Sequence, residues 1–323
     1  MRAAVGWLSS DSTGRSVDPR DPAFRRSGGF PSPAQRRRAL AAVVTYLRCP
    51  SCAGPVSLGG GRLACGRGHS FDIARHGYAN LTAGRTGPGT ADTTAMVAAR
   101  DRFLSGGHYQ PLAAAVRSLA RHYDHRGPGL AIDLAGGTGY YLARTLDALP
   151  HRRGVCLDLS VPALRRAARA HRRAAALGAD VWQPLPLAAR SAAVVLSIFG
   201  PRNAAETSRI LTPDGTLILA VPGAAHLGEL TGPLGMISID QRKPGRLAEA
   251  YRGYAQSEVI TVNYQLKLDH ADLTALVTMG PSARHIAPQD LATRIGGLPS
   301  PVTVTVDLQI RALRLRNPVR GQG

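Results

Sequence analysis

Four potential metal ligands lie close together in the first quarter of the chain. Cys49 and Cys52 are separated by two residues, and Cys65 and His69 follow after a gap of twelve. Two such pairs, each in a tight turn, supply the closed tetrahedral set of a structural Zn2+ ion and leave no position for a reacting water. In so small a segment a metal replaces the hydrophobic core. The spacing predicts a structural zinc site; the alternative is a set of unpaired thiols.

A second candidate site is a glycine-rich turn after an apolar strand. The sequence AIDLAGGTG, residues 131–139, places Asp133 before the turn, and Asp158 ends the next predicted strand. An acidic residue at that point accepts the ribose hydroxyls of a bound nucleoside. No Gly-Lys-Ser/Thr is present, so nucleotide hydrolysis is not expected, and the pattern suits S-adenosylmethionine better than a dinucleotide. The residues predicted to bind this cofactor are Asp133, Gly136, Gly137, Thr138, Gly139 and Asp158.

From residue 130 onward the hydrophobic pattern alternates between strand and helix. A helix is predicted over 162–177, and a third strand begins at 180–182. Two long segments, 259–268 and 302–313, alternate with period two and are expected to complete the sheet in antiparallel fashion. The predicted fold is α/β: a class I S-adenosylmethionine-dependent methyltransferase with a Rossmann-like, seven-stranded sheet and a small N-terminal zinc-binding module.

Composition narrows the class of partner. The 323 residues carry a formal net charge of +19, which favours a polyanion or a membrane surface. No run of roughly 18 apolar residues and no signal peptide is found, so we expect a soluble, cytoplasmic protein without a membrane partner. The predicted organisation is a disordered basic leader (1–38), a zinc-binding module (39–82), a linker with helices (83–125) and a methyltransferase domain (126–323).

These motifs resemble the 23S rRNA guanine-N1 methyltransferases of the RlmA type. The resemblance runs from about residue 48 to the C-terminus and is most specific where the zinc knuckle leads into Phe-Asp and Gly-Tyr-x-Asn-Leu. The matching stretches include CPSC (49–52), CGRGHSFD (65–72), HGYANL (76–81), DTTAMVAAR (92–100), FLSGGHYQPL (103–112) and PGAAHLGEL (222–230).

The resemblance implies roles for particular residues. Zinc would be held by the three cysteines and His69, in a module that recognises RNA. The methyl donor would be contacted by Tyr109, Gly137, Thr138 and His226. Two departures stand in the loop: Ala135 replaces the usual Gly, which costs about 1 kcal/mol if φ must be positive, and Gly136 replaces a frequent Cys.

The resemblance also implies a partner, a hairpin in domain II of 23S rRNA, and a homodimer as a possible assembly. Residues 38–48 and 91–96 look more like the branch that confers tylosin resistance, which methylates guanine 748; the neighbouring guanine 745 is the alternative. Two readings compete with RNA methylation. One is a small-molecule methyltransferase whose zinc module is only structural, and the other is an RNA-binding protein without catalysis.

Methylation at guanine N1 sets its own requirements. N1 carries a proton at neutral pH and lies inside the Watson–Crick pair, so the target base must be unpaired or flipped out. The reaction needs in-line positioning, an acceptor for that proton and a donor to O6. No catalytic residue is assigned: His226 is a candidate for cofactor contact or proton handling, and Asn203 for contact with the base. Five arginines over 165–173 form either a solvated face or an RNA contact.

Overall fold

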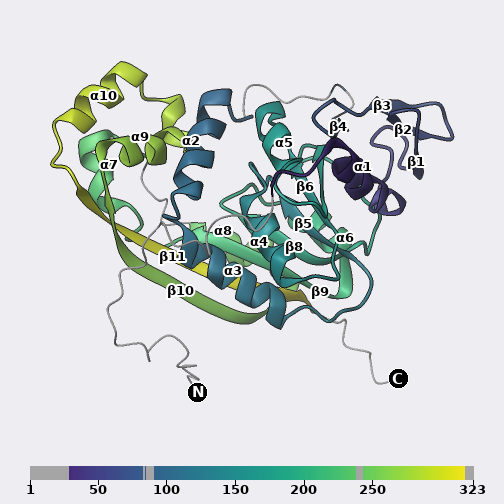
Figure 1. Cartoon of the computed structure of the whole chain (residues 1–323). Helices are drawn as coiled ribbons and strands as arrows, with labels where there is room; N and C mark the ends of the chain where they lie inside the picture. The colour runs from purple at the N-terminus through teal and green to yellow at the C-terminus, as the bar shows by residue number, and fades with distance from the viewer. Residues whose placement is uncertain (1–28, 83, 85–90, 238–242, 317–323) are drawn as a thin grey trace, which may run out of the picture.

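The protein is built on one mixed eight-stranded sheet. The computed structural model describes residues 29–82, 84, 91–237 and 243–316. Most of the predicted leader and part of the predicted linker therefore lie outside the described residues. The strand order is β10-β11-β9-β8-β5-β6-β7-β4, and a separate three-stranded sheet, β1-β2-β3, belongs to the N-terminal module (Figure 1).

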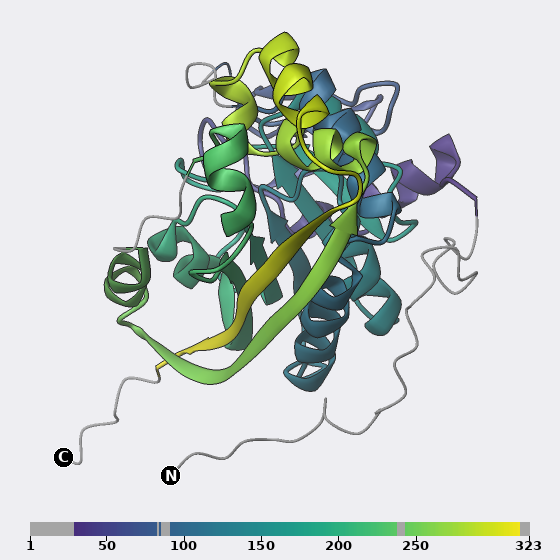
Figure 2. The ribbon, with the colours of Figure 1, turned by 90° about the vertical axis from the view of Figure 1, so that its left-hand side faces the viewer.

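Seven of the eight strands come from the predicted methyltransferase region. They are β5 (Leu130–Leu134), β6 (Gly154–Asp158), β7 (Ala174–Gly178), β8 (Ala192–Ile198), β9 (Leu211–Pro222), β10 (Tyr254–Leu268) and β11 (Val302–Leu315). The first five are parallel, whereas β11 runs antiparallel between β9 and β10. Figure 2 shows β10 and β11 as a long twisted ribbon. The predicted doubly wound sheet with an antiparallel finish is confirmed.

The two faces of the sheet are buried by different elements. One face packs against α3 (Gln110–His122), α4 (Tyr140–Ala148) and α5 (Val161–Ala167). The other packs against α6 (Ala204–Ile210), α8 (Lys243–Ala250) and the N-terminal module. Successive residues of β5 alternate between the faces as a pleated strand requires: Ala131 joins the first core and Ile132 the second.

The remaining helices lie at the ends of the sheet. They are α2 (Thr94–Ser105), α7 (Gly228–Leu234), α9 (His270–Thr278) and α10 (Pro288–Gly296), with the 3-10 turn η3 (Pro281–Arg284). Helices α2 and α3 are separated at Gly106-Gly107. Among the residues with described positions, no helix is long and apolar enough to cross a bilayer.

The N-terminal module packs directly onto the methyltransferase sheet. It contains α1 (Pro33–Ala41), the 3-10 turn η2 (Val44–Tyr46), β1 (Val56–Gly59), β2 (Arg62–Cys65), β3 (Ser70–Asp72) and β4 (Tyr78–Asn80). Strand β4 pairs in parallel with β7 and so adds the eighth strand. The stretch 179–191, between β7 and β8, contains no helix. Leu47 of the module pairs there with Leu187, and both are buried. The module thus covers the face that a crossover helix would cover.

Four predictions about these elements are wrong. The sheet has eight strands instead of the predicted seven, because β4 joins it. A strand of only three residues gives no recognisable pattern in the sequence. The helix predicted over 162–177 ends at Ala167, and the third strand is Ala174–Gly178 rather than a segment from Asp180. The alanines of β7 favour a helix by intrinsic propensity, but the pairing of this strand with β6 and β4 overrides that preference. Residues 33–38 are not disordered: they lie in α1, which begins with a capping box formed by Ser32 and Gln35.

Candidate cofactor site and metal centre

The four predicted metal ligands come together beside the three-stranded sheet. Their ligand atoms, from Cys49, Cys52, Cys65 and His69, all lie within 4.8 Å of one another. The Sγ atoms of Cys52 and Cys65 are 3.7 Å apart. Tetrahedral zinc with bonds of about 2.3 Å separates two thiolates by ~3.8 Å. The cluster therefore fits zinc as it stands.

The acidity of one thiol also suits a metal. Burial acts to raise the pKa of Cys65, but hydrogen bonds from the Arg67 backbone and from His69 outweigh it and bring the pKa down to about 6. The thiolate is the form that binds zinc. Cys156 is fully buried in β6 and takes no part in the cluster.

The glycine-rich turn lies at the carboxyl end of β5, the point at which the order of the strands in the sheet reverses. Strand β5 lies between β6 and β8, and a ligand crevice forms where crossovers leave to opposite sides of such a sheet. The N–H of Gly136 donates to the Leu157 carbonyl over 3.0 Å, and the N–H of Gly137 donates to Asp158 Oδ2 over 2.8 Å. The turn is thereby bound to the end of β6. The structure brings all the residues predicted for this loop together: Asp133, Gly136, Gly137, Thr138, Gly139 and Asp158.

The backbone of the turn is left-handed at Ala135. Its φ is +52°, and that of Gly137 is +57°. An L-residue in this region costs roughly 1–2 kcal/mol, so the expected cost of Ala at this position is present. Gly136 is constrained by space instead. A Cβ there would lie 2.7 Å from the Asp133 carboxyl and from Cys156 Sγ, so any larger residue requires the neighbours to move.

Asp133 is a buried carboxyl group with an unsatisfied oxygen. The residue is 1% exposed, and Oδ2 has no hydrogen-bond partner in the part of the chain that the structure describes. Burial, together with the charge of Asp158, raises the pKa of Asp133 to about 8. Such a group is costly unless a donor or a cation reaches it. The ammonium group of S-adenosylmethionine is a partner of this kind, so the residues present fit the predicted cofactor.

Asp158 has capacity left for a ligand. Its two carboxylate oxygens accept from the N–H groups of Gly137 and Ser160, each over 2.8 Å. Each oxygen keeps a second lone pair that can accept from a hydroxyl group. Burial raises the pKa of Asp158.

Tyr109 and His226, far apart in the sequence, are hydrogen-bonded to each other. Tyr109 is 3% exposed at the start of α3, and its Oη lies 3.3 Å from His226 Nε2. The N–H of Asp307 donates to His226 Nδ1, also over 3.3 Å. Burial lowers the pKa of His226 to about 4, so the ring is neutral at pH 7. A neutral ring that accepts at Nδ1 carries its proton on Nε2, and that N–H donates to Tyr109.

Phe199 completes an aromatic cluster with this pair, and the sequence analysis assigned it no role. Its ring centroid is 6.1 Å from that of Tyr109 and 6.3 Å from that of His226, nearly parallel to the latter at 18°. The side chain is 40% exposed and the φ angle is +57°. The next residue packs against the cofactor loop, because a Cβ on Gly200 would lie 3.1 Å from the Leu134 carbonyl oxygen. A large aromatic residue directly after a buried strand was the available signal.

Asn203, the candidate for base contact, has another task. Its Oδ1 accepts from the Glu206 N–H over 3.1 Å and caps α6, and its Nδ2 donates to the Val181 carbonyl over 3.0 Å. Both ends of the amide are therefore occupied within the fold. The geometry gives Asn203 a structural role.

Arg100 is a second residue near the cofactor loop that sequence reasoning missed. It forms an ion pair with Asp92, and its Nη2 donates to the Met279 carbonyl over 2.8 Å. A Cβ on Gly137 would lie 3.0 Å from its Nη1, so the guanidinium rests against the loop. The carbonyl of Asp92 also accepts from Ser160 Oγ over 2.7 Å. The segment before α2 is thus tied to both strands that carry the site.

The strand order, the glycine loop and the orphaned carboxylate together define a class I S-adenosylmethionine-dependent methyltransferase that carries a zinc ribbon. Residues 47–83 match the family model described as RlmA, N-terminal, a zinc ribbon. Over 277 residues the chain is 45% identical to the 23S rRNA (guanine(748)-N(1))-methyltransferase of Streptomyces fradiae, covering 84% of this chain and 98% of that protein.

Two further relatives bear names for the same guanine-N1 methylation of 23S rRNA. One, from Micromonospora griseorubida, is 42% identical over 84% of this chain and 98% of its own length. The other, from Bacillus subtilis strain 168, is 33% identical over 82% of this chain and 96% of its own length. The chain belongs to the 23S rRNA (guanine-N1)-methyltransferase family.

Proposed function

We propose that this protein transfers a methyl group from S-adenosylmethionine to N1 of a guanine in 23S rRNA. The observation that carries the proposal is a buried cofactor loop with an orphaned carboxylate, directly beside a partly exposed aromatic ring. Nearly full-length similarity to the Streptomyces fradiae enzyme supports the choice of guanine 748 over its neighbour. The expected substrate is then a hairpin of domain II in 23S rRNA, met in the cytoplasm, and a homodimer remains a prediction.

The cofactor would be held from three sides. Asp133 receives the methionyl ammonium, Asp158 accepts from the ribose hydroxyls, and the backbone of Gly137 and Thr138 lines the space between them. When bound, S-adenosylmethionine supplies an already activated methyl group. The protein therefore contributes position and charge rather than a nucleophile of its own.

The hydrogen-bonded pair Tyr109 and His226 would orient the reacting groups. Because Nε2 of His226 carries a proton and Nδ1 accepts from the backbone, neither ring nitrogen is free to remove the guanine N1 proton. His226 is thereby assigned as a positioning residue. Tyr109 accepts from His226, so its own hydroxyl hydrogen remains available to a ligand. As N1 attacks the methyl group, its proton must leave to solvent or to another acceptor.

Phe199 is the residue that we assign to the target base. A guanine that has left its helix loses stacking, and an exposed aromatic ring beside the cofactor restores it. The backbone of Phe199 is in the left-handed region, and such strain is typical of functional sites. No described feature selects guanine over other bases, and the relatives' names carry that part of the proposal.

The test is methyl transfer from labelled S-adenosylmethionine to 23S rRNA taken from a strain that lacks the modification. We expect label in RNA and no transfer to small nucleosides. Label in nucleosides alone would instead support a small-molecule methyltransferase, and cofactor binding without any transfer would support a non-catalytic RNA-binding protein. The link to tylosin resistance is a separate expectation, tested by the tylosin sensitivity of a strain that expresses the gene.

A further inference from the structure

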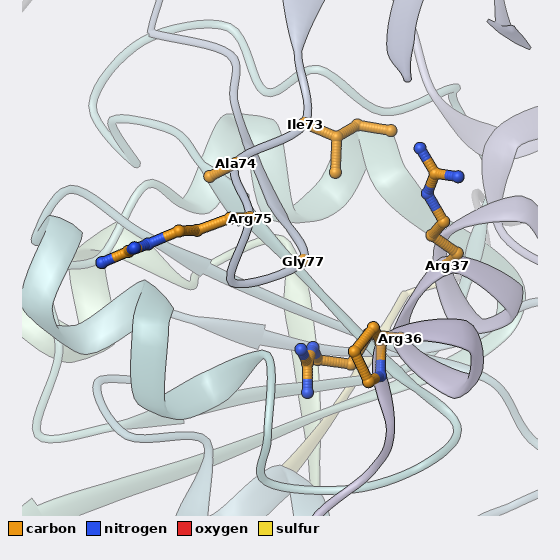
Figure 3. A pocket seen from close by; sticks show the side chains of 7 residues that line it. Arg36, Arg37, Ile73, Ala74, Arg75 and Gly77 are labelled. Carbon is orange, nitrogen blue, oxygen red and sulfur yellow. The ribbon is translucent and has the colours of Figure 1, made fainter. Parts of the chain in front are cut away.

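A basic cavity lies where α1 meets the turn formed by residues 73–77 of the zinc module. Its volume is about 110 Å3, and its lining includes Arg36, Arg37, Arg75 and Gly77. Figure 3 shows Arg36 and Arg37 on α1, across from the segment that carries Ile73, Ala74, Arg75 and Gly77. The cavity is separate from the metal cluster and from the cofactor loop, and neither of those sites accounts for it.

Arg36 is held in this cavity by close packing. Its Cβ and Nε would each lie 2.9 Å from a Cβ on Gly77, a residue with φ of +90°. Only glycine satisfies both the backbone angle and the close approach. Arg36 Nη1 donates to the Pro31 carbonyl over 2.6 Å, whereas its Nε is buried and has no hydrogen-bond partner among the residues with described positions. The guanidinium is therefore fixed in place with one donor unsatisfied.

Further positive charge gathers on the other side of the turn, around His76. Burial lowers the pKa of His76, and so do the charges of four arginines, which are Arg75, Arg169, Arg165 and Arg36. Arg169 Nη2 lies 2.9 Å from His76 Nδ1. Guanidinium groups at such density repel one another unless an anion lies among them.

The carboxylates of neighbouring elements are engaged elsewhere. Asp72 lies 4.0 Å from Arg62, and Asp101 is 2.9 Å from Arg166. Four of the five arginines over 165–173 have different roles in the structure. Arg166 forms the ion pair just named, and Arg173 donates to four main-chain carbonyls. Arg165 and Arg169 join the cluster around His76.

We propose that the cavity between α1 and the 73–77 turn binds a backbone phosphate of the RNA substrate. This rests on the proposed function, and it adds a contact made by α1, which lies before the stretch that resembles the family. Among the described residues no aromatic side chain lines the cavity, so it suits a phosphate rather than a stacked base. Helix α5 links it to the catalytic site: the helix begins three residues after Asp158 and carries Arg165, one of the arginines around His76.

The experiment compares two double variants that remove the same charge. The first double variant, Arg36→Gln with Arg75→Gln, alters the cavity. The second, Arg117→Gln with Arg121→Gln, alters two exposed arginines of α3, a helix that packs on the other face of the sheet. Binding of a domain II hairpin RNA is measured against salt concentration. Loss of one phosphate contact lowers the slope of log K against log salt by about 0.7–0.9. We expect that change for the cavity pair only, with KM for RNA raised about tenfold and kcat and cofactor affinity unchanged.

Two results would overturn the proposal: an unchanged slope for the cavity pair, or an equal change for the α3 pair. The charge-preserving variant Arg36→Lys with Arg75→Lys should keep the slope, which separates lost charge from lost folding. If the wild-type protein methylates the RNA while the cavity pair binds it normally, only this inference fails. If the wild type neither binds nor methylates the RNA, the proposed function itself fails.

Discussion

The metal cluster and the cofactor site are assembled in opposite ways. All four metal ligands lie within 21 residues of sequence, Cys49 to His69, and two short turns suffice to bring them together. The cofactor site draws on the ends of β5, β6 and β8, on the start of α3 and on the segment after β9. Its residues meet only when the whole sheet is folded.

This difference determines what each region depends on. The buried residues of the zinc module share one hydrophobic cluster with a face of the sheet, so the module gains stability from the metal and from this packing. The cofactor site rests on a large core and can therefore hold strained or unsatisfied groups, as at Ala135 and Asp133.

Removal of the metal should damage the module and spare the cofactor site. We expect Cys52→Ser to lose zinc and to lower stability by about 4 kcal/mol or more, roughly 10 °C in Tm, because the module then loses its main support. RNA methylation should fall with it, while S-adenosylmethionine affinity changes less than about threefold. Zinc content, thermal melting and calorimetric binding measure the three quantities. The control is Cys156→Ser, which should retain zinc; equal zinc content in both variants would contradict the ligand assignment.

Loss of the Asp133 charge should produce the reverse pattern. Asp133→Asn should weaken S-adenosylmethionine binding by about 10- to 100-fold, the range of a charge-assisted hydrogen bond, and leave zinc bound. The free protein should lose little stability, because Oδ2 has no partner among the described residues and the amide keeps an oxygen that can accept from the Leu142 N–H. Asp214→Asn, at an exposed side chain, is the matched control. Normal cofactor affinity in Asp133→Asn would remove this residue from the site.

The same carboxyl group makes cofactor binding depend on pH. With its pKa raised to about 8, Asp133 is protonated in the free protein below that pH, and a bound cation favours the ionised form. Affinity should therefore fall as pH is lowered from 8 to 6, by up to about tenfold per pH unit. The folded protein keeps a proton that the unfolded chain releases near pH 4, so stability of the free protein should decrease as pH rises from about 4 to 8. Asp133→Asn should flatten both profiles.

Phe199→Ala tests the target side of the cofactor site. Loss of base stacking should lower kcat/KM for RNA by about 5- to 100-fold, while S-adenosylmethionine affinity and zinc content stay unchanged. Phe199→Trp should restore most of the activity, because it keeps a stacking surface. If Phe199→Leu performs as well as the wild type, the ring serves only to fill space.

Ala135→Gly should give the smallest effect. Relief of the left-handed strain is worth about 1 kcal/mol, and the added freedom of glycine in the unfolded chain offsets part of it. We expect a rise in Tm of at most about 3 °C. Ala131→Gly, in strand β5 without a positive φ, should lower Tm instead, and a fall in both variants would show that position 135 is not strained.

The sequence predicted features that depend on local spacing. The zinc ligands, the glycine loop and the alternating strands all follow from short-range patterns, and the structure contains each of them. The predictions from sequence were wrong where tertiary contacts determine the secondary structure. The strand Ala174–Gly178 looks helical by composition, and β4 is too short to be recognised without its partner β7.

The functional residues show the same division. Asp133 and Asp158 follow from the loop pattern, but Phe199 and Arg100 acquire their positions only from neighbours distant in the sequence. Asn203 was a candidate because of its place after β8, and the structure occupies both of its polar atoms in capping α6 and binding Val181. The position of a residue along a strand thus predicts whether it lies near the site. Whether it can act there depends on its having a polar atom that is not already hydrogen-bonded within the fold.

The most direct test is to map the methyl group on the RNA product. Purified protein, S-adenosylmethionine and unmodified 23S rRNA are incubated, and the RNA is digested and examined by mass spectrometry. We expect one N1-methylguanine in the domain II hairpin. It should be absent when the Asp133→Asn variant is used in place of the wild type at limiting cofactor. A methyl group on another atom, or none with zinc and cofactor both bound, would contradict it.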